Sequence, residues 1–187
     1  GWGTPVAQVH ENVQGIVSDG ASEDELGRSV AISGNYAVVG APFHNTNGNA
    51  DRGKAYIFYY NGTTWSQQAI LTSSDGGTFN NFGESVATDG TYAVVGASGY
   101  NGQGKVYVFV RNGTTWSQQA MLTASDAAAG DNFGNCVSIH SDFILAGATH
   151  CDYGGHTDKG KAYIFERTGT AWPQTAILTP PDGATGD

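Results

Sequence analysis

Charged residues are scarce in this sequence, and basic residues are the scarcest. Only 13% of the 187 residues are Asp, Glu, Lys or Arg, and 8 Lys and Arg stand against 17 Asp and Glu, for a formal net charge of −9. Proteins that bind nucleic acid or anionic membrane surfaces present clustered Lys and Arg to the phosphates. No apolar run approaches the roughly 18 residues of a membrane-spanning helix. We therefore expect no nucleic-acid partner and no membrane insertion.

Sequence patterns typical of catalysis are also missing. The segment 96–100, GASGY, falls short of the G-x-S-x-G pattern of serine hydrolases because position 100 is Tyr. None of the five His residues stands at a repeated position together with a carboxylate and a nucleophile. We expect a protein that is not an enzyme and that needs no cofactor.

Glycine, in contrast, is abundant, with 28 residues, and much of it recurs at a fixed spacing. Three similar units follow one another, residues 18–72, 73–123 and 124–179. Only one segment, 41–52 in the first unit, changes in length between units, which marks it as a surface loop. The positions that recur in register are Gly27, Gly83 and Gly134; Gly40, Gly96 and Gly147; Gly53, Gly104 and Gly160; and Trp65, Trp116 and Trp172.

Each unit has the pattern of four short antiparallel strands. In the first unit these are SVAI, YAVVGA, KAYIFYY and WSQQAILT, runs rich in β-branched and aromatic residues and bounded by turn residues. The dipeptides Asn61-Gly62, Asn112-Gly113 and Asp89-Gly90 predict type I′ hairpin turns. Four-stranded units of about 50 residues in tandem are typical of β-propeller blades. We predict an all-β fold of three such blades. The recurring Trp residues are predicted to serve blade packing, and the alternative is a platform for sugar binding.

The aligned motifs resemble the FG-GAP repeat of integrin α-subunit propellers, and most closely its bacterial, short-loop variety. The motifs are Phe82-Gly83 with Gly96-Ala97, Leu26-Gly27 with Gly40-Ala41-Pro42, and the shared patterns G-K-[AV]-Y-[IV]-F and T-x-W. The resemblance implies a propeller-type fold. Integrin-type repeats hold calcium between the first two strands, but the connections here, such as ISGN, are too short to supply six to eight oxygen ligands. The calcium sites of the family are therefore not transferred.

Three units are fewer than the four to eight blades of a closed propeller. Residues 1–17, with Trp2, resemble a strand of an adjoining blade, and residues 180–187 resemble the start of the linker to a next repeat. The chain is then a piece of a longer propeller, a subunit completed by copies of itself, or an open stack of blades. An open stack exposes strand edges. We expect completion by other polypeptide, as a homo-oligomer, a filament or further repeats of a longer chain.

Two kinds of covalent modification are predicted. Cys136, at the start of one strand, and Cys151, just past the end of its hairpin partner, lie where an antiparallel pair brings the two ends together, which predicts a disulfide and an oxidising compartment. The alternative is a pair of unrelated free thiols. Asn61 and Asn112 begin N-x-T sequons at equivalent hairpin tips and are candidate N-glycosylation sites, although the dipeptide with Gly also has a simple role as the turn itself.

Oxygen-bearing side chains recur in two places. Asn45, Asn47, Asn49 and Asp51 alternate as ligands do in calcium loops, but a single carboxylate predicts poor affinity, so no metal ligand is assigned. An Asp also precedes each FG motif, at Asp19, Asp75 and Asp126, and again at Asp182. Such an Asp beside Gly or Ala is predicted to cap a turn by accepting hydrogen bonds from backbone amides, and the alternative is a recurring cation site.

These observations favour a non-enzymatic extracellular or cell-surface module for adhesion or structural self-assembly. The alternative is a lectin that binds glycans in pockets between blades, and either function could involve a glycan or a surface protein as partner. Binding to glycans would separate the two.

Overall fold

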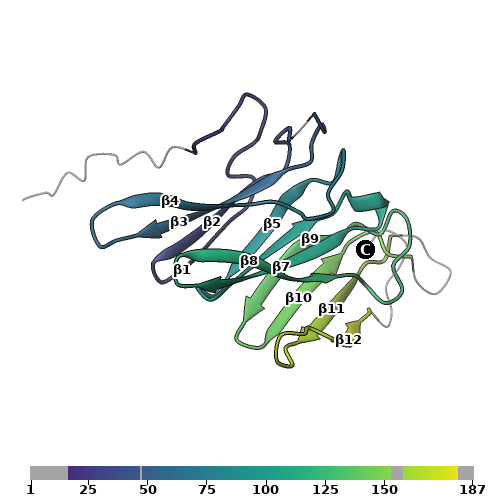
Figure 1. Cartoon of the computed structure of the whole chain (residues 1–187). Coiled ribbons are helices and arrows are strands. Elements are labelled where there is room, and N and C mark those ends of the chain that lie inside the picture. The colour runs from purple at the N-terminus through teal and green to yellow at the C-terminus, as the bar shows by residue number, and fades with distance from the viewer. Residues whose placement is uncertain (1–16, 47, 153–157, 181–187) are drawn as a thin grey trace, which may run out of the picture.

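The computed structural model describes residues 17–46, 48–152 and 158–180, which form three antiparallel sheets of four strands each (Figure 1). In every sheet the strands follow one another in chain order, which confirms the predicted all-β fold of three propeller-type blades. The first blade contains β1 (Val30–Ser33), β2 (Tyr36–Ala41), β3 (Lys54–Tyr60) and β4 (Trp65–Leu71). The second contains β5 (Phe82–Thr88), β6 (Tyr92–Ala97), β7 (Lys105–Asn112) and β8 (Thr115–Leu122), and the third β9 (Phe133–His140), β10 (Phe143–Ala148), β11 (Lys161–Glu166) and β12 (Gln174–Leu178).

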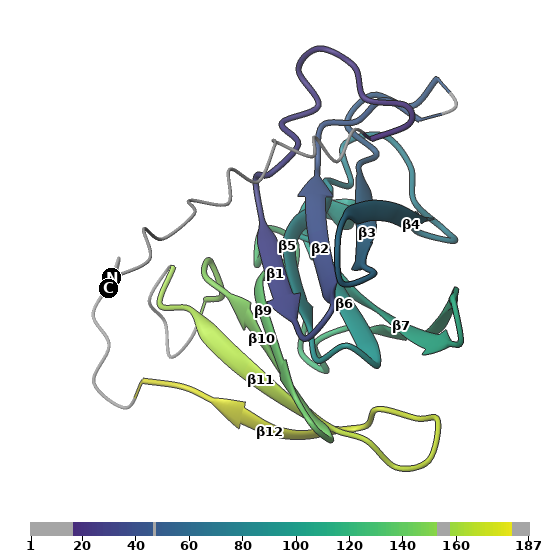
Figure 2. The same ribbon diagram turned by 90° about the vertical axis from the view of Figure 1, so that its left-hand side faces the viewer.

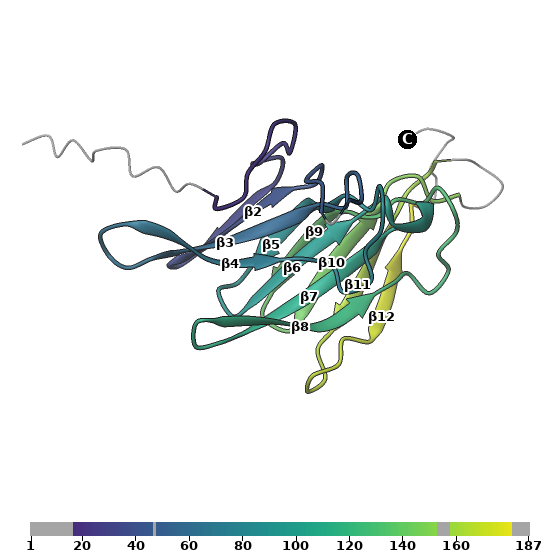
Figure 3. The ribbon, with the colours of Figure 1, turned by 45° about the horizontal axis from the view of Figure 1, so that its top comes forward.

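The blades stand side by side like segments of a fan (Figures 2 and 3). The first strands are central, since β5 lies against both β1 and β9, whereas β4, β8 and β12 form the outer edges. The three sheets do not close into a ring within the described residues. Apart from a 3₁₀ turn, η1 (Tyr100–Gly102), these residues form no helix, and they contain none long and apolar enough to cross a membrane.

The middle blade is buried on both faces because its strands alternate apolar side chains between its two neighbours. On β6, Ala93 and Val95 pack into a core shared with Val38 of the first blade. Val94, between them, packs into a second core shared with Ile144 of the third blade. Successive side chains of a strand point to opposite faces. This explains why β6 is a continuous apolar run rather than an alternating one.

Neighbouring blades meet at a close approach of backbone to backbone, which we call the joint. Ser29 Oγ donates a hydrogen bond to Gly83 O at 2.8 Å, and Ser85 Oγ donates one to Gly134 O at 2.7 Å. A Cβ on Gly40 would collide with Gly83 O, and a Cβ on its equivalent in the second blade, Gly96, would collide with the carbonyl of the third. Gly40 and Gly96 are therefore required by contact between blades.

The aromatic residue of each FG motif completes the joint. Phe82 N donates to Arg52 O at 3.1 Å, so that the motif is hydrogen-bonded to the blade before it. Its ring is fully buried and packs edge-on against Tyr107, with ring centroids 5.3 Å apart. Phe133 repeats both features in the third blade. Leu26 occupies this position in the first blade and is exposed.

The predicted type I′ turns are wrong in detail, although the hairpins are where the sequence placed them. Asn61, Asn112 and Asp89 do not adopt positive φ; only the glycines that follow them do, with φ of 98° at Gly62 and 61° at Gly113. The reason in the second blade is register. Asn112 is still paired in the sheet, opposite Thr115, so the two-residue loop begins at the glycine, and positive φ at its first residue alone is the pattern of a type II′ turn.

The joint predicts an asymmetric response to glycine substitution. Gly96→Ala would force the new Cβ against Gly134 O and Ser85 Oγ. Such overpacking should lower the free energy of unfolding by about 1–3 kcal/mol. The matched control is Gly77→Ala, where a Cβ would meet nothing within 4 Å and the change should stay within about 0.5 kcal/mol. Equal urea midpoints for the two variants would contradict this account of the joint.

Candidate functional site

A triad of Asp, Lys and Tyr side chains recurs once in every blade. Asp75, in the linker that enters the second blade, accepts hydrogen bonds from Lys105 Nζ at 2.6 Å and from Tyr107 OH at 2.7 Å. Lys and Tyr are two residues apart in the G-K-x-Y pattern and so lie on the same face of the strand. The equivalent triads are Asp19, Lys54 and Tyr56 in the first blade and Asp126, Lys161 and Tyr163 in the third.

The predicted role of these Asp residues as backbone caps is therefore corrected. Their two carboxylate oxygens bond a lysine and a tyrosine, and they fasten each linker to the third strand of its blade. Backbone capping belongs to a second Asp nearer the FG motif: Asp24 accepts from Ala21 N, and Asp131 accepts from Ala128 N, both at 2.7 Å. Asp182 lies outside the described residues.

The triad shifts the pKa values of its members in the directions of a stable ion pair. Burial by itself would raise the pKa of Asp75, but the hydrogen bonds from Lys105 and Tyr107 outweigh it and hold that pKa below its usual value. Burial would lower the pKa of Lys105, yet the bond to Asp75 leaves it raised. Burial and then the bond to Asp75 raise the pKa of Tyr107. All three groups therefore keep their ordinary charge at neutral pH.

The side chain beside the triad differs from blade to blade, which favours a structural role over shared chemistry. In the first blade His44 Nε2 lies 3.1 Å from Asp19 O. In the second, Lys105 Nζ lies 3.7 Å from the ring centroid of Tyr100. In the third, Cys151 Sγ lies 3.5 Å from Tyr163 OH. His44, Tyr100 and Cys151 stand at the same position of the three repeats, four residues after the glycine of the second strand, so no single functional group recurs beside the triad.

The two cysteines are free thiols in the structure, so the predicted disulfide is not formed. Cys136 is exposed on β9, where its Sγ covers Gly147 of β10. Cys151 is buried, and burial raises its pKa to about 11. The prediction put Cys136 at the start of its strand, but Cys136 is the fourth residue of β9 and pairs with Gly147. The Cys151 side chain packs against Tyr163 instead.

In the candidate calcium loop, the described side chains are used to hold the loop in shape. Asn45 Oδ1 accepts from Asp51 N at 3.0 Å, and Asn49 Oδ1 accepts from Thr78 Oγ1 at 3.2 Å. Asn47 lies outside the described residues. The third blade closes its loop in the same way, with Asp152 Oδ1 accepting from the amide of Asp158 at 3.1 Å. Among the described residues, no group of three or more His, Cys, Asp or Glu gathers as it would around a metal.

Both sequon asparagines are exposed at hairpin tips, as the sequence predicted. Asn61 Oδ1 accepts hydrogen bonds from Thr63 N and Thr64 N, both at 2.9 Å, so this side chain also shapes the turn. Asn112 is the last residue of β7. Glycosylation at either position stays a prediction.

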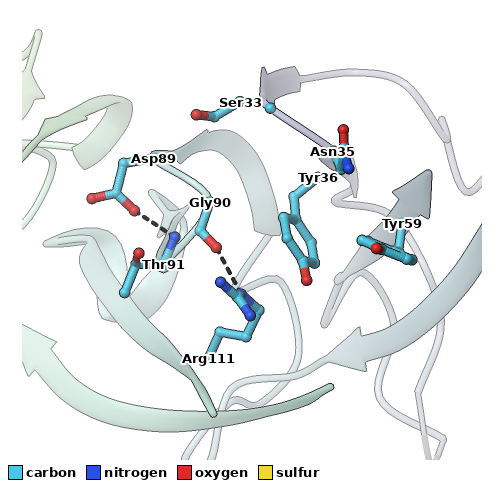
Figure 4. Close-up of a pocket in the computed structure, with 9 residues that line it drawn as sticks. Ser33, Asn35, Tyr36, Tyr59, Asp89, Gly90, Thr91 and Arg111 are labelled. Atoms are coloured by element: carbon cyan, nitrogen blue, oxygen red, sulfur yellow. Dashed lines mark hydrogen bonds between the residues drawn. The ribbon is translucent and has the colours of Figure 1, made fainter. Parts of the chain in front are cut away.

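Sequence reasoning did not identify a cavity of about 470 Å³ between the β1–β2 turn of the first blade and the β5–β6 turn of the second (Figure 4). Tyr36 and Tyr59 form one wall, with ring centroids 5.1 Å apart. Arg111 lies over the Tyr36 ring, with its guanidinium carbon 4.5 Å from the ring centroid, and its Nε donates to Gly90 O at 2.8 Å. Asn35 and Asp89 add polar groups at the rim. This mixture of aromatic faces and hydrogen-bonding groups suits a polar organic ligand.

Two of the residues that line the cavity differ at equivalent positions of other blades. The position of Tyr59 is occupied by Val110 in the second blade, and that of Asp89 by His140 in the third. The sequence alignment of the units gives no signal here, because the three residues at this position, Tyr59, Val110 and Glu166, all differ.

Two apolar faces are exposed at opposite ends of the row of blades. On the first blade Val30 and Ile32 are 69% and 67% exposed, although Val86, the equivalent of Val30, is only 8% exposed. On the third blade Leu145 is 42% exposed, although its equivalent Val94 is fully buried. We call these the first-blade face (Leu26, Val30, Ile32) and the third-blade face (Phe143, Leu145, Leu178).

The FG-GAP repeat model matches the chain three times, at residues 16–58, 65–109 and 116–165. The chain belongs to the FG-GAP repeat family. No curated protein matches the sequence. Among solved structures, the crystal structure of Sqt1 from Chaetomium thermophilum is similar, with a TM-score of 0.54 and 14% identity over 87% of this chain. The match spans 38% of the Sqt1 chain, and at this identity it shows a similarity of fold alone.

In this FG-GAP protein the Asp–Lys–Tyr triad predicts a pH-dependent stability. The pKa of Asp75 is lowered by folding, so its contribution is present above the unfolded value of about 3.9 and is lost as pH falls through the folded value. Asp75→Asn should lower the free energy of unfolding by about 1–2 kcal/mol at pH 7, toward the low end for a charged hydrogen bond because Asp75 is partly exposed.

The measurement is urea unfolding between pH 3 and 7. The difference in free energy of unfolding between the wild type and Asp75→Asn should decrease below about pH 4. The matched control is Asp51→Asn, in a loop with φ of 50° that Asn also adopts, and it should change stability little at any pH. If this difference in free energy of unfolding stayed constant or increased in acid, the triad would not be a stabilising ion pair.

Proposed function

We propose that this chain is a non-enzymatic FG-GAP module for adhesion or structural self-assembly, extracellular or at a cell surface. The observation that carries the proposal is the pair of exposed apolar faces at the two ends of the row of blades. Exposed apolar clusters on an otherwise polar, Gly-rich protein are typical of surfaces that bind protein. The partners that these faces suit are further repeats or copies of the chain, or a surface protein.

The arrangement of polar groups supports a binding module rather than an enzyme. In the recurring triad, the Asp of the linker and the Lys of the third strand form an ion pair, so these charged groups bind each other. The adjacent side chain changes from His44 to Tyr100 to Cys151, so no single functional group recurs beside the triad. The acidic net charge of −9 adds solubility while leaving the apolar faces available.

The proposal predicts adhesion through the apolar faces. Microspheres coated with the protein should cluster and should remain on a protein-coated surface under flow, whereas the double variant Val30→Glu/Leu145→Glu should lose most of both effects. The matched control is Ile70→Glu, a position that is exposed, like its equivalents Met121 and Ile177, in all three blades. Equal retention of wild type and double variant would contradict adhesion through these faces.

The cavity favours a second function, the binding of a glycan. Tyr36 and Tyr59 offer aromatic faces, and Asn35, Asp89 and Arg111 offer hydrogen-bonding groups around about 470 Å³. If the cavity binds sugar, Tyr59→Ala should abolish glycan-array signals that the wild type gives. Tyr60→Ala is the control, because that neighbouring ring packs on Trp65 instead. A wild type that binds no glycan, or two variants with equal signals, would reject the cavity as a lectin site.

A further inference from the structure

Each internal joint consists of a receiving half and an inserting half. The receiving half is a glycine of the second strand together with the serine opposite it, Gly96 and Ser85 in the second blade. The inserting half is the FG glycine of the next blade, whose carbonyl accepts the bond from the serine, as Gly134 O does at 2.7 Å. The inserting glycines need a left-handed backbone, with φ of 99° at Gly83 and 85° at Gly134.

A second contact between blades accompanies each internal joint, at the start of the second strand. Tyr36 of the first blade packs edge-on against Trp116 of the second, with centroids 5.8 Å apart. Trp116 Nε1 also donates to Gln68 Oε1 at 3.0 Å, back across the joint. The next joint repeats the arrangement with Tyr92 and Trp172, at 5.3 Å.

The third-blade face carries a receiving half. Gly147 takes the position of Gly96, and among the described residues a Cβ placed on it would meet Cys136 and Asn135 of its own blade but no inserted carbonyl. Phe143 takes the position of Tyr92 and is exposed. Leu145 and Leu178 surround this position, and a shallow apolar cavity of about 300 Å³ lies over them.

The first-blade face carries an inserting half. Gly27 has φ of 94°, the conformation of the two inserted glycines, and a Cβ on it would meet nothing within 4 Å. Val30 and Ile32 project beside it and are exposed. Trp65 occupies the position of Trp116 and Trp172. The backbone shape of the joint therefore exists at both ends of the described chain, with its two halves on opposite faces.

We propose that a second copy of this chain inserts its first blade onto the third-blade face, reproducing the internal joint between molecules. This inference rests on the proposed function and names the partner of its apolar faces. Gly27 O of one copy would lie over Gly147 of the other, with Trp65 packed against Phe143. Such a contact is heterologous, so it leaves one free half at each end and continues into rings or filaments.

The joint between copies differs from the internal joints in ways that make it weaker. Cys136 replaces the serine that donates to the inserted carbonyl, and a thiol is a weak donor. Thr175 stands where Gln68 and Gln119 accept the Trp hydrogen bond. Tyr60 stands where Arg111 and Arg167 lie over the tyrosine rings. Association should accordingly be reversible and should depend on protein concentration.

The test is light scattering coupled to size exclusion, over a range of concentrations of the full chain. The wild type should grow from 19.4 kDa to species larger than dimers. Val30→Glu and Leu145→Glu should each be monomeric alone, since each blocks one half of the joint. Mixed in equal amounts, they should form a dimer and stop, because each supplies the half that the other lacks. Ile70→Glu should assemble like the wild type.

Cys136→Ser separates a specific joint from nonspecific apolar association. Serine restores the donor of the internal joints, so this variant should associate several-fold more tightly, whereas purely apolar association would be unchanged or weakened by the more polar side chain. The proposal is overturned if the wild type stays monomeric at all concentrations, if Val30→Glu or Leu145→Glu alone forms dimers, or if Cys136→Ser does not tighten association. Monomers that still cluster microspheres would overturn this joint while leaving the adhesive function standing.

Discussion

The close approach of one blade's backbone carbonyl to the glycine of the preceding blade is the contact on which the rest of the molecule depends. It leaves no space for a Cβ at Gly40 or Gly96, and it positions the FG aromatic ring in the core between blades. Because a backbone carbonyl is buried there, it needs a donor, which Ser29 and Ser85 provide. The GAP glycine of one repeat and the FG glycine of the next repeat are thus the two sides of one contact.

The Asp–Lys–Tyr triad has a different role, which is to anchor the linker that leads into each blade. The linker is irregular and partly exposed, so it has little apolar surface to hold it in place. Two hydrogen bonds from a strand to one carboxylate fix its position, and one of them is an ion pair. Since the triad is local to each blade, the neighbouring loop is free to change in length and in sequence.

The fold could be predicted from the sequence because the same pattern occurs three times in register, so that each unit supports the interpretation of the others. The turn type at Asn112 could not, because it depends on whether Asn112 is the last paired residue of the strand or the first of the loop. The partners of Asp75 are thirty or more residues away, whereas turn statistics consider only near neighbours. The cavity beside Tyr59 is formed by hairpins of two different blades, and no local pattern encodes that distance.

A joint built from backbone shape and small residues has a further consequence. Long complementary side chains would make each joint specific for its own pair of blades, but both internal joints use the same glycine, serine hydroxyl and backbone carbonyl. The two internal joints of this chain accordingly use one geometry with different surrounding apolar residues, Val95 at one and Ile144 at the other. One joint then differs from another mainly in the strength of a few hydrogen-bond donors. The replacement of Ser by Cys136 and of Arg by Tyr60 falls on the two faces that are exposed, where a weaker copy of the internal contact would permit reversible association without competing with the joints that hold the blades together.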